Sequence, residues 1–312
     1  MKEEILITGH KNPDTDSICS ALIMEDLAKK LGVNNVKAVR IGKVNKETQY
    51  ILDYLKIDAP EFIERAEDGD KLILVDHNEA TQSINNRENT EVLAVIDHHR
   101  ISDFCTANPL YFLEKPYGCT ATLLFEQYKI ANIDIDKKIA TLMLSAIISD
   151  TLLLKSPTCT KKDVEVLGEL EKITGLDVNK YGLEMLKAGT DISTFSSEEV
   201  INLDAKESNS GCKKVIISQV NTADIDDVFS RREELEFAIE KEIADKKLDL
   251  YIFVITDIIN TNSRIIALGN EKSIVEKVFD KKLDEFDSMF LEGVVSRKKQ
   301  IAPKIVEELK DK

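Results

Sequence analysis

The sequence predicts an α/β protein with an N-terminal doubly wound parallel sheet and a smaller C-terminal α/β domain. In the first half, short apolar runs alternate with segments that are apolar at helical spacing, which is typical of parallel strands joined by helices. A small polar stretch, AGTDISTFSS, then interrupts the pattern, and a second set of strand-like runs follows it. We therefore expect one domain at 1–188, a linker at 189–196 and a second domain at 197–312.

The expected strands of the first domain are continuous aliphatic runs, as in a sheet that is buried on both faces. They span 5–8, 36–41, 71–75 and 92–96. The expected helices span 18–31, 46–55, 118–130, 136–151, 161–174 and 178–186. Ser17 is placed as the N-cap of the first helix. Asp150 lies near the C-terminal end of an apolar helix, where the helix dipole disfavours an anion, so a metal ligand is a better interpretation than a structural acid.

The second domain is expected to combine strands and helices with less regular alternation. Strands are expected at 201–205, 215–220, 250–256 and 264–268. Helices are expected at 231–246 and 271–279, and the polar tail at 301–312 also reads as helical.

Composition and charge exclude several classes of protein. A net charge of −15 argues against a broad nucleic-acid surface and fits a solvated acidic surface, with room for a carboxylate cluster that binds cations. No apolar run approaches the length of a membrane span, and the first strand starts too early for a signal peptide, so a cytoplasmic protein is expected. Five cysteines without CxxC spacing fit a reducing compartment and no zinc–thiolate site. They are Cys19, Cys105, Cys119, Cys159 and Cys212.

Acidic and imidazole side chains follow the ends of the predicted strands. The loop HKNPDTDS follows the first strand and carries His10, Asp14 and Asp16. In extended backbone the two aspartates would point the same way, and two like charges repel unless a cation lies between them. The alternative is an acidic turn with a capping aspartate. The four histidines all lie in the first third of the chain, each after a strand-like run, at His10, His77, His98 and His99.

Six residues form the candidate metal cluster, namely His10, Asp14, Asp16, Asp76, His98 and Asp150. Carboxylates with imidazoles and no thiolate suit Mn²⁺, Co²⁺, Fe²⁺ or Mg²⁺. Six protein ligands are too many for one catalytic ion with open positions, but they suit two ions ~3.5–4 Å apart that share a carboxylate. In extended backbone His98 and His99 face opposite ways, which would leave His99 free to donate a proton or to contact substrate.

These motifs resemble the DHH phosphoesterase superfamily. The resemblance rests on the GHKNPDTDS loop, the DHNE segment and the DHH triplet, and SRKKQ at 296–300 is similar to the C-terminal signature of manganese-dependent family II inorganic pyrophosphatases. It covers the whole chain, with the motifs in family order. It implies a homodimer that hydrolyses pyrophosphate to two phosphates, in a cleft between a DHH and a DHHA2-type domain, without a covalent intermediate.

The resemblance also implies roles for individual residues. His10 and Asp14 would ligate one Mn²⁺ or Co²⁺ ion, Asp16 and His98 the other, with Asp76 bridging and Asp150 completing the cluster. The residues implied to bind or protonate substrate are His99, Lys206, Arg297 and Lys298. Further Mg²⁺ or Mn²⁺ would arrive with the substrate. His77 and Asn12 receive no ligand role, Asp97 is expected to orient one of the adjacent histidines, and Lys299 could be an ordinary surface lysine.

Two other classes of function remain open at this point. An exopolyphosphatase or an oligonucleotide-trimming nuclease would use the same first half. Nucleases of this kind carry a GGGH-type motif near the C-terminus, however, and this chain has no histidine beyond His99, no tryptophan and no basic patch with interleaved aromatics. A non-catalytic metal or phosphate binder is expected to have lost part of the cluster, and no member is missing.

Overall fold

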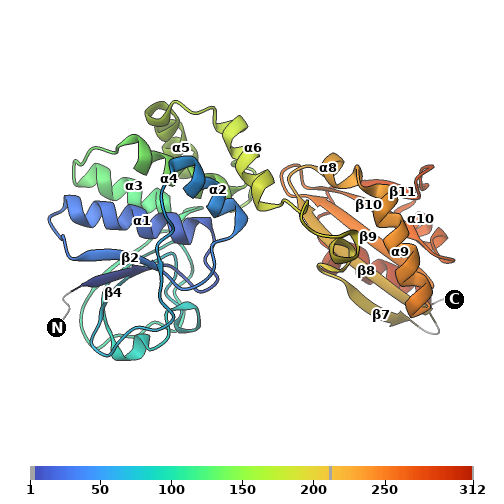
Figure 1. Ribbon diagram of the computed structural model, residues 1–312, viewed down its shortest axis with the longest axis horizontal. Coiled ribbons are helices and arrows are strands. Elements are labelled where there is room, and N and C mark those ends of the chain that lie inside the picture. The colour runs from blue at the N-terminus through green and yellow to red at the C-terminus, as the bar shows by residue number, and fades with distance from the viewer. Residues whose placement is uncertain (1–3, 211–212, 311–312) are drawn as a thin grey trace. The chain divides into compact units, whose positions relative to one another are not determined.

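The computed structural model describes residues 4–210 and 213–310, and Cys212 lies outside these ranges. The chain divides into two compact units, one ending at Gly189 and the other beginning at Thr190 (Figure 1). Each unit has its own sheet and its own core, and the two are described separately. None of the helices in the described residues is both long enough and apolar enough to cross a membrane.

The first unit contains a parallel sheet in the order β3-β2-β1-β4-β5-β6. Its strands are β1 (Ile5–Thr8), β2 (Val36–Arg40), β3 (Glu61–Phe62), β4 (Lys71–Val75), β5 (Glu91–Asp97) and β6 (Tyr111–Glu114). The chain leaves β1 toward β2 on one side and returns to β4 on the other, so the strand order reverses between β1 and β4. In open α/β sheets this switch point is where ligands bind, at the carboxyl ends of the strands.

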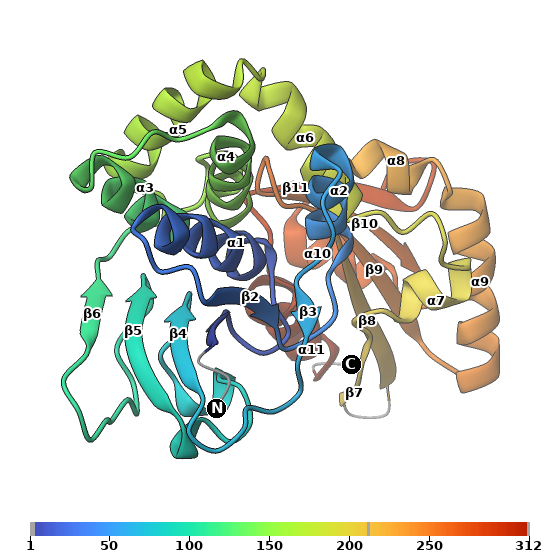
Figure 2. The same cartoon turned by 60° about the vertical axis from the view of Figure 1, so that its left-hand side comes forward.

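The helices of this unit gather beside the sheet, as Figure 2 shows for α1, α3 and α4 above β4 and β5. They are α1 (Thr15–Lys30), α2 (Lys46–Leu55), α3 (Thr120–Ile130), α4 (Lys137–Thr151), α5 (Lys161–Thr174) and α6 (Val178–Gly189). A separate apolar cluster joins the sheet residues Leu6, Leu72 and Leu74 to Ile84 and Phe104. Ile84 lies between the short 3₁₀ turns Ala80–Gln82 and Arg87–Asn89, and Phe104 lies in the irregular segment between β5 and β6, so loops supply part of the covering layer.

The second unit is built on a mixed sheet in the order β11-β10-β9-β8-β7, in which β8 and β9 are parallel and the other pairs antiparallel. The strands are β7 (Lys206–Ser210), β8 (Lys213–Thr222), β9 (Leu250–Asp257), β10 (Asn262–Leu268) and β11 (Ser288–Glu292). The helices are α7 (Ser197–Asn202), α8 (Ile225–Phe229), α9 (Arg232–Lys246), α10 (Ser273–Phe279) and α11 (Ala302–Lys310). Two apolar clusters, one around Tyr251 and one around Ile252, cover its opposite faces, because alternate residues of β9 point to opposite sides.

The predicted fold class is confirmed, but two local predictions are wrong and several short strands were missed. Ser17 does not cap α1: Asp14 has extended backbone and accepts the Ser17 N–H at 3.0 Å, so the helix begins earlier and Asp16 lies in its first turn. The strand expected at 201–205 does not form: Ser196 and Glu199 form a capping box that starts α7, which includes residues 201 and 202, and a turn follows. The short strands β3, β6, β7 and β11 were not predicted, since none is a continuous aliphatic run.

Candidate metal centre

The predicted ligands come together at the switch point of the first sheet. His10 follows β1, Asp76 follows β4 and His98 follows β5, so three neighbouring parallel strands deliver side chains to one edge. Helices supply the others, since Asp14 and Asp16 lie at the start of α1 and Asp150 lies in the last turn of α4. Residues far apart in the sequence therefore meet because of strand order and helix packing.

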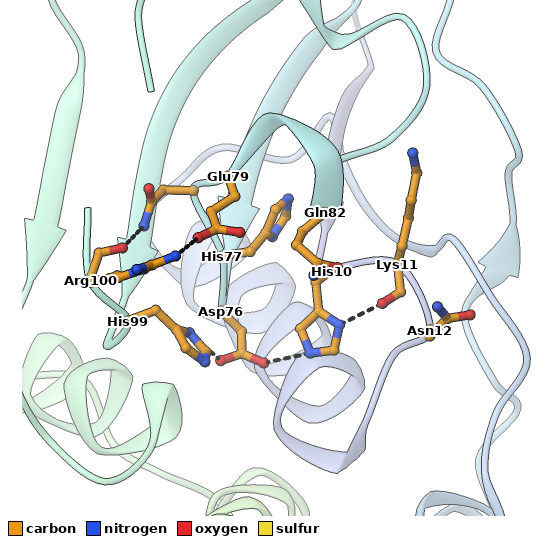
Figure 3. A pocket seen from close by; sticks show the side chains of 10 residues that line it. His10, Lys11, Asn12, Asp76, His77, Glu79, Gln82, His99 and Arg100 are labelled. Carbon is orange, nitrogen blue, oxygen red and sulfur yellow. Dashed lines mark hydrogen bonds and ion pairs between the residues drawn. The ribbon is translucent and has the colours of Figure 1, made fainter. Parts of the chain in front are cut away.

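Asp76 stands between the two imidazoles of the cluster. Its Oδ2 is 3.4 Å from Nε2 of His10, and its Oδ1 is 3.3 Å from Nε2 of His98 (Figure 3 shows the His10 side). Asp76 is 1% exposed and has a left-handed backbone, with φ at 60°. Each oxygen thus faces a different histidine, which is the arrangement that a carboxylate bridging two cations requires.

The tautomers of the two histidines favour ligation through Nε2. Nδ1 of His10 is 2.8 Å from the Lys11 carbonyl oxygen, and Nδ1 of His98 is 3.0 Å from that of Tyr117. A carbonyl oxygen can only accept, so each Nδ1 carries a proton, and Nε2 is the nitrogen that faces Asp76; once Nε2 has given up its own proton, its lone pair is available to a metal ion. The buried Oδ2 of Asp76 also lacks a hydrogen-bond partner of good geometry among the described residues. Lone pairs that face one another fit divalent cations between them.

The remaining carboxylates extend the cluster to either side of Asp76. Oδ2 of Asp14 is 3.3 Å from Nε2 of His10, and ligand atoms of His10, Asp14 and Asp76 all lie within 4.8 Å of one another. On the other side, Oδ2 of Asp150 is 3.8 Å from Nε2 of His98. Asp16 and Asp150 belong to a second close group, which Cys119 completes. The six predicted residues therefore form one continuous cluster with Asp76 at its centre.

The fully buried Asp16 is held by hydrogen bonds from another helix. Oδ2 accepts the Thr120 N–H at 2.6 Å and Oδ1 accepts the Ala121 N–H at 3.2 Å, while Ser20 Oγ donates to Oδ1 at 2.8 Å. The N–H groups belong to the first turn of α3, where the helix dipole favours an anion. The start of α3 therefore fixes the orientation of a proposed ligand on α1.

Protonation in this cluster differs strongly from that of isolated side chains. Burial lowers the pKa of His10, but its partners Asp14 and Asp76 outweigh burial and raise that pKa to about 11. Burial likewise opposes protonation of His98, yet Asp76 and Asp16 raise its pKa to about 9. Burial and the charge of Asp76 raise the pKa of Asp16 to about 6. Without metal the cluster holds protons, and cations would displace them.

The adjacent histidines do not face opposite ways as extended backbone would require. The chain bends after β5, and the His98 and His99 rings pack edge to face with centroids 4.2 Å apart. Nδ1 of His99 is 2.9 Å from Oδ1 of Asp97 and 3.7 Å from Oδ1 of Asp76. The prediction that Asp97 orients one of the histidines is confirmed. His99 is half exposed and lines a cavity of about 370 Å³ together with His10 and Asp76 (Figure 3).

His77 is buried behind the cluster. Its Nδ1 lies 2.9 Å from the Val75 carbonyl oxygen, and its Nε2 has no hydrogen-bond partner among the described residues. Burial lowers the pKa of His77 to about 4, so the ring is neutral. It belongs to none of the close ligand groups among the described residues.

The predicted substrate residues of the second unit lie at two neighbouring places in its structure. Lys206 begins β7 and is exposed, while Arg297 begins a π-helical turn at Arg297–Ile301 and is only 9% exposed. Nη2 of Arg297 is 3.1 and 3.2 Å from the carboxylate oxygens of Asp204. Lys298 and Lys299 are exposed. Arg297 is thus a buried, ion-paired arginine rather than part of a surface cluster.

Several residues beside the cluster were missed by sequence reasoning. Cys119 and Thr120 are adjacent to Asp16 but follow no recognisable motif. Asn78 lies within the DHNE segment, and its Nδ2 donates to Oδ2 of Asp97 at 2.7 Å. Glu47, in the first turn of α2, binds Thr15 and Ser149, and nothing in its local sequence separates it from a surface glutamate.

Comparison with known proteins identifies a known domain in each half of the chain. The model of the DHH family N-terminal domain matches residues 4–147, and the model of the DHHA2 domain matches residues 183–307. Both halves of the chain therefore carry the domains of DHH-type proteins.

The chain is also similar to named proteins along nearly its full length. It is 56% identical over 302 residues to the manganese-dependent inorganic pyrophosphatase of Bacillus subtilis, covering 96% of this chain and 97% of that protein. A crystal structure of a Methanococcus jannaschii protein assigned to the family II inorganic pyrophosphatases matches with a TM-score of 0.62 and 38% identity, over 98% of this chain and 99% of that one. The chain belongs to the family of manganese-dependent inorganic pyrophosphatases.

Proposed function

We propose that this protein hydrolyses inorganic pyrophosphate to two phosphates at a dinuclear manganese centre, with Co²⁺ as an alternative metal. The observation that carries the proposal is Asp76, whose two oxygens face the Nε2 atoms of His10 and His98 at 3.4 and 3.3 Å. The manganese dependence and the substrate are those in the name of the Bacillus subtilis relative. The chemistry of the donor set supports them, because carboxylate oxygens and imidazoles suit Mn²⁺.

The proposed ligand sets follow the two sides of Asp76. His10 and Asp14 would hold one ion, Asp16 and His98 the other, with Asp76 shared and Asp150 completing the cluster. Bound divalent ions would lower the pKa of water and offset negative charge on the phosphoryl group under attack. The fixed protein groups orient the ligands: backbone carbonyls hold both imidazoles, and the first turn of α3 holds Asp16.

The remaining residues of the proposed site act on the substrate. His99 carries a raised pKa because of its hydrogen bond to Asp97, so it can bind a phosphoryl oxygen and give a proton to the departing phosphate. Lys206, Arg297 and Lys298 would bind the remaining oxygens of pyrophosphate, the arginine as a planar fork and the lysines as point charges. Water attacks phosphorus directly, with no covalent intermediate, and additional Mg²⁺ or Mn²⁺ accompanies the substrate.

The setting proposed for this activity is a cytoplasmic homodimer that binds neither nucleic acid nor membrane. The acidic net charge of −15 supports the first exclusion, since nucleic-acid surfaces are basic.

The metal requirement tests the proposal directly. The metal-free protein is titrated with Mn²⁺ while bound metal and phosphate release from pyrophosphate are followed together. Activity is expected to rise until two equivalents are bound. Full activity at one equivalent, or no hydrolysis at any loading, would contradict the dinuclear proposal.

A further inference from the structure

Glu47 lies beside the metal cluster without belonging to any of its close ligand groups. It is in the first turn of α2, and burial raises the pKa of its carboxyl group. Oε1 accepts hydrogen bonds from two hydroxyl groups, Thr15 Oγ1 at 2.6 Å and Ser149 Oγ at 2.5 Å. One carboxylate oxygen thus joins two helices that approach each other from distant parts of the chain.

Both hydroxyl donors are sequence neighbours of proposed ligands. Thr15 stands between Asp14 and Asp16 at the start of α1, and Ser149 immediately precedes Asp150 in the last turn of α4. The two segments lie far apart in the sequence, so only non-covalent contacts hold them together. Their hydrogen bonds to Glu47 therefore bear on the separation between the aspartates of α1 and the aspartate of α4.

Helix capping does not explain Glu47. The N-cap of α2 is Asn45, whose Oδ1 accepts the Thr48 N–H at 2.7 Å, so Glu47 is not needed as a cap. Burying a carboxylate beside other acids is unfavourable, as the influence of Asp14 on its pKa shows. The hydrogen bonds from Ser149 and Thr15 act in the opposite direction on that pKa, so they offset part of the cost of burying the carboxylate.

Gly189 leaves the space that Glu47 occupies. It is the last residue of α6, and a Cβ atom added there would lie 2.8 Å from Cβ and 3.0 Å from Oε2 of Glu47. Within a helix, alanine is normally more favourable than glycine. The close approach to the Glu47 side chain gives a local reason for a glycine at 189. The Glu47 carboxylate therefore lies between the backbone of Gly189 and the hydroxyl groups of Thr15 and Ser149.

We propose that Glu47 is a positioning residue of the metal centre: through Thr15 and Ser149 it fixes the aspartates at the start of α1 relative to Asp150 on α4. The inference rests on the proposed function, because it assumes that these aspartates hold the metal ions. Groups that orient metal ligands typically contribute about 10–100-fold to metal affinity.

The test measures Mn²⁺ affinity on the metal-free full-length protein by electron paramagnetic resonance of free Mn²⁺, with no substrate present. E47A should weaken binding about 10–100-fold, and E47Q, which keeps an oxygen acceptor, should bind close to wild type. S149A should weaken binding in the wild-type background but add nothing further in E47A, because its partner is already gone. Thermal unfolding of each metal-free variant is recorded alongside.

S145A is the matched control on the same helix. Ser145 lies one turn before Ser149 and bonds to Thr141 and Tyr181 instead of Glu47, so its loss should leave Mn²⁺ affinity unchanged. The inference would be overturned if E47A bound Mn²⁺ with wild-type affinity, or if S149A had the same effect in the wild-type and E47A backgrounds. It would also be overturned if S145A and E47Q weakened binding equally. Failure of the proposed function is recognised separately, as a wild-type protein that binds Mn²⁺ but does not hydrolyse pyrophosphate.

Discussion

Nδ1 of His99 lies 2.9 Å from Oδ1 of Asp97, where β5 ends beside the metal cluster. The same oxygen accepts the backbone N–H groups of His98 and His99, and the other oxygen accepts Asn78 Nδ2. Asp97 is itself buried and has a lowered pKa because its partners outweigh burial. The pair therefore consists of an ionised carboxylate and an imidazole that is oriented and favoured in its protonated form.

Replacing His99 by asparagine should abolish most turnover and leave the metals in place. A general acid typically contributes about 10²–10⁴-fold in rate, so kcat of His99→Asn should fall by that order. Metal content after gel filtration should stay at two Mn²⁺ per chain. A variant that instead loses an ion would make His99 a metal ligand, as a member of the close group that it forms with Asp76 and His98.

Asp97→Asn is the companion variant for the pH profile. Asp97 raises the pKa of His99, so its neutral replacement should lower that pKa toward the usual value. An acid is active only while protonated, and the alkaline limb of kcat should therefore move to lower pH. An unchanged limb would mean that another group sets it.

Asp76→Asn should damage both proposed metal sites together. The residue faces His10 with one oxygen and His98 with the other, and an amide has only one oxygen to offer. We expect loss of both ions from a wild-type content of two per chain, measured by elemental analysis after gel filtration. One tightly held ion in the wild type, or full metal content in the variant, contradicts the bridging role.

Metal-free protein should lose stability as pH rises from about 6.5 to about 9, the interval between the ordinary pKa of histidine and the value for folded His98. A raised pKa means that the folded state binds the proton more tightly than the unfolded state. The contribution of His98 to the free energy of unfolding is therefore complete below pH 6.5 and disappears above pH 9. His10, with a pKa of about 11, acts in the same direction. Thermal unfolding against pH tests this, and the Mn²⁺-loaded protein should lack the decline because cations replace the protons.

Arg297→Ala and Lys298→Ala should each lower kcat/KM by about 10²–10³ if their charge-assisted contacts strengthen in the transition state. Lys299→Ala is the matched control, since it removes a neighbouring exposed cation and should leave kinetics near wild type. Arg297 also pairs with Asp204, so its variant is compared with Asp204→Asn in thermal unfolding. If Arg297→Ala, Lys298→Ala and Lys299→Ala all lowered kcat/KM equally, the cause would be a general charge effect instead of specific contacts.

The buried elements of the fold were predictable from sequence because their patterns are local. The runs that became β1 and β4, and the amphipathic α2, carry their periodicity within a few residues. The two-residue β3 and the edge strand β6 depend on pairing with neighbours, which no local pattern records. Likewise, the capping box of Ser196 and Glu199 overrides the apolar run that favoured a strand.

The candidate site was predictable as a set of residues but not as a geometry. Strand-end positions of His10, Asp76 and His98 follow from parallel topology alone. The packing of His98 against His99 depends on a bend after β5, and the contact of Glu47 with Ser149 joins residues about a hundred positions apart. The first depends on the path of a loop and the second on the packing of α2 against α4, and a local sequence pattern records neither.

Phosphate release by the Mn²⁺-loaded full chain tests the central claim most directly. Pyrophosphate, tripolyphosphate and a dinucleotide are offered at equal concentration, with Asp76→Asn measured in parallel. The account predicts rapid hydrolysis of pyrophosphate, far slower reaction of the other two, and loss of activity in the variant. Preference for tripolyphosphate or for the dinucleotide, or pyrophosphate hydrolysis that survives Asp76→Asn, would contradict it.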